Sequence, residues 1–354
     1  MSKCPFHSGA SEEQPPPGHP PVENADVNSS EPACPHLRKV AAEKKAASER
    51  AEPQCPHLRK LQADEDQAPA ASSEPASWAT ATPEEFKDHF TKAYDAMSAH
   101  PKATKDKAHI ASILMGYLGY TEEELAVIGD DVQLMQGTGN PHILAKIKAG
   151  ETVVDLGSGF GIDAFVAAHK VGESGRVVGI DLAMNEVNAA IQRTSTRKLR
   201  NVDFRLGDIE APPMADASVD CVISNGGFCL VPRKAVAFEE IFRMLKPGGR
   251  FSISCTTSTK DLDPSLDWPS CMVVFMPLRT VEEMLSKIGF VDIVIDTSNS
   301  SMTVWEDAKA KSEKPIDDDG AKITIHKGES RYAFLKNMDM NEFFARVNIY
   351  AAKP

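Results

Sequence analysis

Carboxylates and glycines alternate with short apolar runs in the middle of the chain, and their spacing could hold a ligand. Residues 155–161 read Asp-Leu-Gly-Ser-Gly-Phe-Gly and overlap the end of an apolar run at 152–156. Glycines at alternate positions let a backbone turn sharply and approach a ligand without side-chain clash. Asp181 follows Gly161 by 20 residues, at the end of a second apolar run. A carboxylate in that position can accept hydrogen bonds from both hydroxyls of a ribose.

Two nucleotide cofactors fit such an arrangement, and the glycine spacing distinguishes them. A dinucleotide needs Gly-x-Gly-x-x-Gly, so that its pyrophosphate meets a helix N-terminus. This chain has Gly-x-Gly-x-Gly and then Asp163, a carboxylate that would repel a pyrophosphate. Asp155 can help position the ammonium-bearing methionine moiety of S-adenosylmethionine, and Asp208 suits the adenine amino group. The pattern favours S-adenosylmethionine.

The elements that must position these residues alternate between strand and helix. Apolar runs at 152–156, 176–181, 202–206, 219–224 and 250–255 predict strands, and amphipathic stretches lie between them. This alternation predicts an α/β, Rossmann-like fold: a mostly parallel, seven-stranded sheet with helices on both faces. Strands at 291–296 and 346–350 are expected to complete the sheet as an antiparallel edge. Ligands of such sheets bind beyond the carboxyl ends of the strands.

The chain divides into four segments by composition and pattern. Residues 1–80 predict a disordered tail, because Pro, Glu, Ser, Ala and Gln leave too little apolar surface to fold. Residues 81–148 predict a helical lead-in, with helix starts at Thr82 and Thr121. Residues 149–257 form the expected cofactor-binding core. Residues 258–354 supply further strands, a helix with a capping box at Thr280, and an acceptor cover at 300–335.

Five short segments match the pattern of a known family. They are Asp-Leu-Gly-Ser-Gly at 155–159, Val-Gly-Ile-Asp at 178–181, Leu-Gly-Asp-Ile-Glu at 206–210, Ile-Ser-Asn at 223–225 and Leu-Lys-Pro-Gly-Gly at 245–249. In this pattern the chain resembles class I S-adenosylmethionine-dependent methyltransferases. Over roughly residues 115–300 it is most similar to the arsenite methyltransferases.

The resemblance implies methyl transfer from S-adenosylmethionine to a small-molecule acceptor, an activity of class EC 2.1.1. Cys271 alone matches a cysteine of the arsenite methyltransferases and is the candidate catalytic residue. Thr138 and Gly226 stand where that family has its other cysteines, so arsenic chemistry does not carry over, and no metal ligands are assigned. The candidate cofactor-binding residues are Asp155, Gly157, Ser158, Gly159, Gly161, Asp181, Leu182, Asp208, Ile209 and Asn225.

Three further cysteines lie in the folded part of the sequence. Cys221 and Cys255 fall within apolar strands and are expected to be inert core thiols. Cys229 lies three residues past the position of Gly226. It could replace the missing thiol only if the turn aims it at the same point.

The tail carries a Cys-Pro repeat at Cys4, Cys34 and Cys55, each with a nearby histidine. An exposed Cys-Pro unit resembles the haem-regulatory motif, in which a thiolate binds ferric haem. Gathering of a soft metal is a second interpretation, and a duplicated docking element for a protein partner is a third. A regulatory protein derived from a methyltransferase, with this tail as its sensor, is therefore the alternative function.

The overall charge narrows the range of partners. A net charge of −12 argues against nucleic acid, which needs clustered Lys and Arg. The segment 225–227, Asn-Gly-Gly, also lacks the Asn-Pro-Pro-Tyr type loop of enzymes that methylate base amino groups. No apolar run approaches the ~20 residues of a membrane span, and no secretory signal is present. We expect a cytoplasmic protein.

Overall fold

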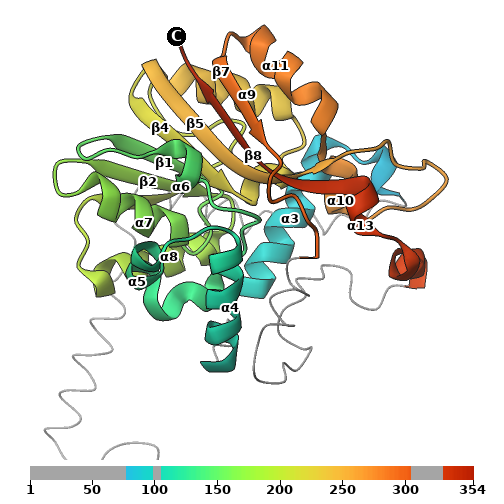
Figure 1. Ribbon diagram of the computed structural model, residues 1–354, viewed down its shortest axis with the longest axis horizontal. Coiled ribbons are helices and arrows are strands. Elements are labelled where there is room, and N and C mark those ends of the chain that lie inside the picture. Colours follow the sequence, from blue (N-terminus) through green and yellow to red (C-terminus); the bar gives the residue numbers. More distant parts are fainter. Residues whose placement is uncertain (1–76, 99–104, 304–329) are drawn as a thin grey trace, which may run out of the picture. The chain divides into compact units, whose positions relative to one another are not determined.

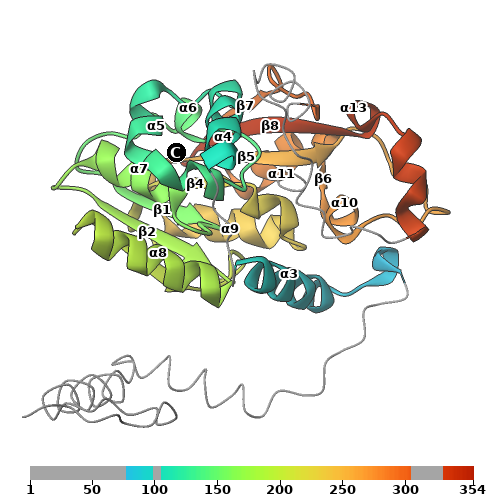
Figure 2. The ribbon, with the colours of Figure 1, turned by 90° about the horizontal axis from the view of Figure 1, so that it is seen from below.

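A twisted sheet of eight strands, with helices on both faces, forms the centre of the structure (Figures 1 and 2). The computed structural model describes residues 77–98, 105–303 and 330–354, all within the compact unit Ser73–Pro354. The strands are β1 (Thr152–Leu156), β2 (Arg176–Asp181), β3 (Val202–Leu206), β4 (Val219–Asn225), β5 (Leu245–Ser258), β6 (Met276–Pro277), β7 (Val291–Asp296) and β8 (Phe344–Ala352).

The strand order is β3-β2-β1-β4-β5-β8-β7, with β6 paired to β5 beside this path. The first five strands pair in parallel, and β8 pairs antiparallel with both β5 and β7. The predicted α/β fold is therefore confirmed, with one correction. As expected, β7 and β8 complete one side of the sheet with antiparallel pairing, and β8 lies between β5 and β7. An eighth strand, β6, was not predicted, since two residues are too few to give a periodic pattern.

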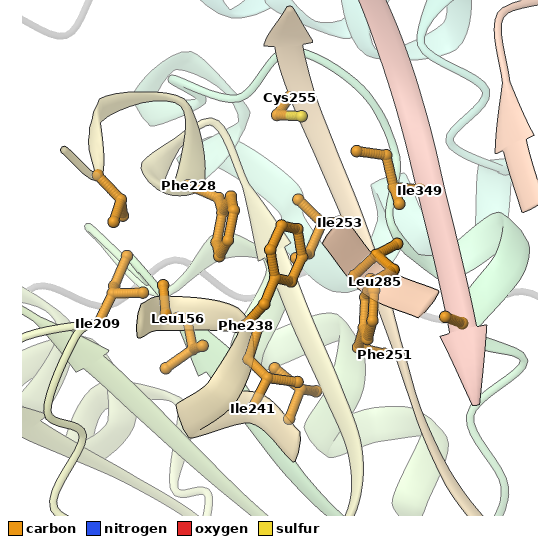
Figure 3. Close-up of a cluster of buried hydrophobic side chains, with 14 of the residues drawn as sticks. Leu156, Ile209, Phe228, Phe238, Ile241, Phe251, Ile253, Cys255, Leu285 and Ile349 are labelled. Atoms are coloured by element: carbon orange, nitrogen blue, oxygen red, sulfur yellow. The ribbon is translucent and has the colours of Figure 1, made fainter. Parts of the chain in front are cut away.

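The two faces of the sheet bury different side chains of the same strands, because successive residues point to opposite faces. On one face, Val153 and Phe204 pack with Phe165 of α7 (Ile162–Val171) and with α8 (Met184–Arg197). On the other face, Phe251 packs with Phe238 of α9 (Lys234–Met244) and with α11 (Val281–Ile288). Figure 3 shows the second cluster, which extends from Ile209 to Leu285.

The helical lead-in begins as its caps predict. In α3 (Pro83–Ser98), the amide of Thr82 donates to Glu85 at 2.7 Å, and the amide of Glu85 donates to the Thr82 hydroxyl at 3.2 Å. A reciprocal pair between Thr121 and Glu124 starts α5 (Glu122–Ile128). The other helical elements are η1 (Trp78–Thr80), α4 (Lys105–Tyr117), η2 (Gly129–Leu134), α6 (His142–Ala145), η3 (Gly227–Leu230), α10 (Ser270–Val274), η4 (Leu278–Thr280), η6 (Ser330–Asn337) and α13 (Met340–Phe343).

Two local predictions differ from the structure. The capping box at Thr280 is wrong, because the preceding turn η4 has already made the backbone helical, and the Thr280 hydroxyl donates instead to the carbonyl of Pro277 at 2.8 Å. The folded part also starts earlier than expected. Trp78 is buried with its ring 5.2 Å from that of Phe86. The Cys-Pro repeats, and residues 304–329 of the expected acceptor cover, lie outside the described residues.

Candidate active site

A pocket opens at the carboxyl ends of β1, β2, β3 and β4, where the sequence predicts the ligand. It encloses about 990 Å³ of empty space, including open solvent at its mouth. One wall comes from the sheet ends, and the opposite wall comes from α3 and the segment after η2. Nine of the predicted cofactor-binding residues line this pocket: Asp155, Gly157, Ser158, Gly159, Asp181, Leu182, Asp208, Ile209 and Asn225.

The loop after β1 adopts a backbone that only glycine tolerates easily. Gly157, Gly159 and Gly161 all have positive φ, at 72°, 49° and 86°. A Cβ on Gly157 would lie 2.8 Å from the Cα of Gly227, so the two loops can touch only because both residues are glycine. The amides of Gly157 and Ser158 both donate to the carbonyl of Ile180, at 2.8 and 3.1 Å. These bonds hold the glycine loop against the end of β2.

Asp155 and Asp181 place one buried and one partly exposed carboxylate around this loop. Asp181 accepts from the amide of Gly159 at 2.8 Å and from that of Ala183 at 2.9 Å. Asp155 is 1% exposed, and its Oδ2 has no hydrogen-bond partner among the described residues. Burial raises the pKa of both carboxyls, and the charge of Asp163 adds to the effect at Asp155. A cation bound here would offset the free-energy cost of keeping these carboxyl groups ionised.

Asp208 and Ile209 lie at the far end of the pocket, after β3. The Oδ1 of Asp208 accepts from the amide of Glu210 at 2.9 Å, and its Oδ2 accepts from Lys87 of α3 at 2.6 Å. The side chain of Ile209 is buried and belongs to the apolar cluster beneath the sheet. This end of the pocket therefore offers a carboxylate beside an apolar surface.

Asn225 lines the pocket, but its side chain is fully engaged within the protein. Its Oδ1 accepts from the amides of Thr138 and Gly139, at 2.8 and 3.1 Å. Its Nδ2 lies 2.8 Å from the carbonyl of Gly139, 3.0 Å from Asp163 and 3.0 Å from the hydroxyl of Tyr120. Asn225 thus fixes the segment before α6 against the end of β4.

Gly161 and Cys271 are candidate site residues that the structure places outside the pocket lining. Gly161 caps α7, and a Cβ there would lie 2.5 Å from the ring of Phe204. Cys271 packs against the cluster of Trp78, Phe86 and Phe90, and Phe90 of these lines the pocket. Burial raises the pKa of the Cys271 thiol to about 11, so it is protonated at neutral pH.

The remaining cysteines of the described chain are buried, Cys221 and Cys255 in strands and Cys229 in η3. Cys221 is fully buried, and burial raises its pKa to about 12. Cys229 accepts from the amide of Thr256 at 3.0 Å, and interaction with the Cys255 thiol lowers the Cys229 pKa to about 7. None of the three lines the pocket. Within the described ranges, no group of three or more His, Cys, Asp or Glu side chains is placed to hold a metal ion.

Sequence reasoning missed the pocket residues that come from distant segments. Phe90, Thr91 and Tyr94 of α3 line the pocket, although helical spacing of apolar residues in that segment indicates only a packing face. Glu186 of α8 lies against Gly159 and accepts from Ser98 at 2.7 Å. Burial, together with the charge of Asp181, raises the pKa of Glu186 to about 7. Its position in the first turn of the helix that follows Asp181 is the signal in the sequence that could have identified it.

The charged groups of the lining are mostly acidic. The described lining contains the carboxyl groups of Asp155, Asp163, Asp181, Glu186 and Asp208 and a single cation, Lys87. Such a set fits the sulfonium and ammonium groups of S-adenosylmethionine better than an anionic ligand.

In the parts of the chain that the structure describes, no helix is both long and apolar enough to cross a bilayer.

Comparison with known proteins agrees with this geometry. Residues 147–307 match the family model described as "Methyltransferase domain". Arsenite methyltransferase of Halobacterium salinarum is 37% identical over 197 residues, which cover 53% of this chain and 50% of that protein. Demethylmenaquinone methyltransferase of Lactobacillus johnsonii is 31% identical over 179 residues, 44% of this chain and 73% of that protein. The chain thus spans about half the length of the arsenite methyltransferases that it matches.

A solved structure shares the fold. Phosphoethanolamine N-methyltransferase 2 of Haemonchus contortus, solved in complex with S-adenosyl-L-methionine, superposes with a TM-score of 0.51 at 21% identity. The match covers 68% of this chain and 60% of that one. Together with the sequence matches, this fold shows that the chain belongs to the class I S-adenosylmethionine-dependent methyltransferases and is similar to the arsenite methyltransferases.

Proposed function

We propose that the protein binds S-adenosylmethionine in this pocket and transfers its methyl group to a small-molecule acceptor. The observation that carries the proposal is the buried carboxyl group of Asp155, whose Oδ2 has no partner among the described residues and which borders a lining rich in carboxylates. A buried carboxylate is stable only when paired. The positively charged end of the cofactor supplies that pairing.

Each named residue has a role that its position supports. Asp181 would accept from the two ribose hydroxyls, since its oxygens face the pocket while the amides of Gly159 and Ala183 orient them. Asp208 would accept from the adenine amino group. Leu182 and Ile209 would pack on the faces of the nucleoside, and the backbone of residues 157–159 would approach the methionine moiety.

S-adenosylmethionine bound here would supply a methyl group that its positive sulfur activates for displacement by an acceptor lone pair, and the electrons of the broken carbon–sulfur bond would remain on sulfur. The chain's own task is to align the two reactants and exclude water, and such alignment can contribute about 7–11 kcal/mol to lowering the barrier. Phe90, Tyr94, Leu230 and Val231 provide the apolar wall for this purpose.

The acceptor side of the pocket is less specified than the cofactor side. Cys271 stays our candidate acceptor-side residue. It packs against the cluster of Trp78, Phe86 and Phe90, and it would act as a neutral thiol because burial raises its pKa to about 11. A soft metalloid prefers several thiolates, and no described cysteine lines the pocket. The proposal therefore covers small-molecule acceptors in general, in a cytoplasmic setting, and arsenite is one member of the test panel.

The test uses the full chain, S-adenosylmethionine with a labelled methyl group, and a panel of arsenite, other metalloids, small thiols and lipids. We expect label to move to at least one acceptor class, and we expect Asp181→Asn to abolish most of the transfer. Saturable cofactor binding without transfer would restrict the proposal to binding. Absence of cofactor binding would end it. The regulatory alternative rests on Cys4, Cys34 and Cys55, which lie outside the described residues.

A further inference from the structure

The N-terminal half of α3 is tied by charge to the end of β3. Lys87 reaches Asp208 at 2.6 Å and also contacts Glu210, although 121 positions of sequence separate it from Asp208. Burial disfavours the charge of Lys87, but its hydrogen bonds to Asp208 and Glu210 outweigh burial and raise its pKa. Lys87 is therefore an ammonium group held between two carboxylates at the edge of the pocket.

Glu210 links this contact to a third segment of the chain. Its carboxylate is buried, and it accepts from the amide and the Nε of Arg233, both at 2.7 Å. Arg233 in turn lies 3.6 Å from Glu84, in the first turn of α3. The same two carboxylates, Asp208 and Glu210, thus join α3, the end of β3 and the start of α9.

The contacts of Asp208 determine which way its carboxylate faces. One oxygen is held by the amide of Glu210 and the other by Lys87, so the side chain cannot rotate without breaking a hydrogen bond. Each oxygen of a carboxylate has two acceptor sites. The free acceptor sites of Asp208 therefore stay available to the pocket that Asp208 lines.

We infer that Lys87 is a positioning residue for the adenine end of the cofactor: by binding Asp208 and Glu210 together, it orients the Asp208 carboxylate toward the adenine amino group and holds α3 over the pocket. The inference rests on the proposed cofactor site. It goes beyond that site because it assigns base recognition to a residue of the lead-in helix. Without Lys87, the neighbouring carboxylates of Asp208 and Glu210 would keep one cationic partner among the described contacts, Arg233, which pairs with Glu210.

This role predicts a difference in affinity between ligands that carry adenine and ligands that carry hypoxanthine. Adenine carries an amino donor where hypoxanthine carries a carbonyl acceptor, and a carboxylate aimed at that atom accepts from the first and repels the second. A site built to pair with a donor rejects the analogue that lacks it. A lysine that only stabilised the fold would affect both ligands alike.

The experiment measures the affinity of the full chain for S-adenosylhomocysteine and S-inosylhomocysteine by calorimetry. We expect the unmodified chain to prefer the adenosyl ligand by about tenfold or more, and Lys87→Met to reduce that preference to about threefold or less. Lys87→Arg should retain most of it, because a cation remains. Lys92→Met is the matched control, since Lys92 is an exposed residue of the same helix that pairs only with Asp88 among the described contacts.

The outcomes separate the inference from the proposed function. Equal weakening of both ligands in Lys87→Met, or no change in either, would overturn the positioning role. Equal affinity of the unmodified chain for the two ligands would also overturn it, while leaving the cofactor site standing. Binding of neither ligand would instead remove the proposed function. If Lys87→Met does not fold, as judged by its melting curve, Lys87→Gln replaces it, because the amide keeps a donor without the charge.

Discussion

The amide of Gly159 donates a hydrogen bond to the carboxylate of Asp181 at 2.8 Å, which joins the glycine loop of β1 to the end of β2. A second bond, from the amide of Ala183, fixes the other oxygen of the carboxylate. Two segments that come together only in the parallel sheet thus form one rigid cradle. The cradle exists because β1 and β2 pair in register, with Asp155 opposite Gly179.

Asp181→Asn should weaken cofactor binding strongly. The amide loses the charge and one acceptor oxygen, and hydrogen bonds to a charged group are worth about 1.5–3 kcal/mol each. Loss of about 3 kcal/mol corresponds to a roughly 150-fold weaker Kd. Equilibrium dialysis with labelled cofactor measures the change. Asp203→Asn, an exposed carboxylate on β3 that pairs with Arg176, should leave the Kd within about twofold; equal effects of the two substitutions would contradict the assignment.

Cofactor binding should strengthen as the pH rises from 6 to 8. Burial raises the pKa of Glu186 to about 7, so this carboxyl is largely protonated at the lower pH and loses its proton as the pH rises. Burial also raises the pKa of Asp155. A cationic ligand binds the ionised forms better, so binding should release protons. Calorimetry in two buffers of different ionisation enthalpy measures that release.

The groups that influence the pKa of Glu186, besides burial, are Ser98, Gln136 and the carboxylates of Asp181 and Asp95.

Glu186→Gln is the check on this pH dependence. The variant keeps the size of the side chain and removes its charge, so the slope of affinity against pH should become shallower. A slope identical to that of the unmodified chain would assign the titration to another group. Asp155 is the first alternative, because its pKa is also raised.

Gly161→Ala should destabilise the fold. The residue has φ of 86°, and an added Cβ would lie 2.5 Å from the ring of Phe204. Strain and overpacking of this kind together cost about 2–4 kcal/mol. Urea unfolding followed by tryptophan fluorescence gives the value. Gly116→Ala is the matched control in α4, where nothing lies within 4 Å of the added methyl; it should be neutral or stabilising by up to about 1 kcal/mol.

Cys271→Ala should separate an acceptor role from a packing role. If the thiol contacts the acceptor, kcat/KM for the acceptor should fall about tenfold, a loss of about 1.4 kcal/mol, while the cofactor Kd stays unchanged. The measurement needs the acceptor identified by the labelled-methyl panel. Unchanged kcat/KM, with a lower melting temperature, would place Cys271 in the apolar cluster with Trp78 and Phe86 alone.

The part of the fold that could be predicted is the part with local signals. The glycine loop and Asp181 lie next to apolar runs whose period marks strands, and parallel pairing brings their ends together. The contact between Lys87 and Asp208 has no such local sign, because it depends on where α3 crosses the sheet ends. The insertion of β8 between β5 and β7 is likewise a choice of pairing that no short pattern encodes.

The side-chain roles divide in the same way. Spacing predicts that Asn225 lies at the strand end, and the structure places it in the pocket lining. Its hydrogen bonds to Thr138, Gly139 and Tyr120 depend on segments about 85 to 105 positions away. The packing of Cys271 against Phe86 and Phe90 of α3 likewise depends on a segment far away in the sequence. Residue type and strand position are thus readable from sequence, whereas hydrogen-bond partners and burial require the packed structure.

The most direct test of the proposed cofactor site is a calorimetric titration of the full chain with S-adenosylhomocysteine, repeated with Asp155→Ala and with Asp181→Asn. We expect one saturable site per chain, with affinity reduced at least tenfold in each variant while both variants keep a cooperative melting transition. No detectable binding by the folded, unmodified chain would contradict it. Equally tight binding by both folded variants would also contradict it.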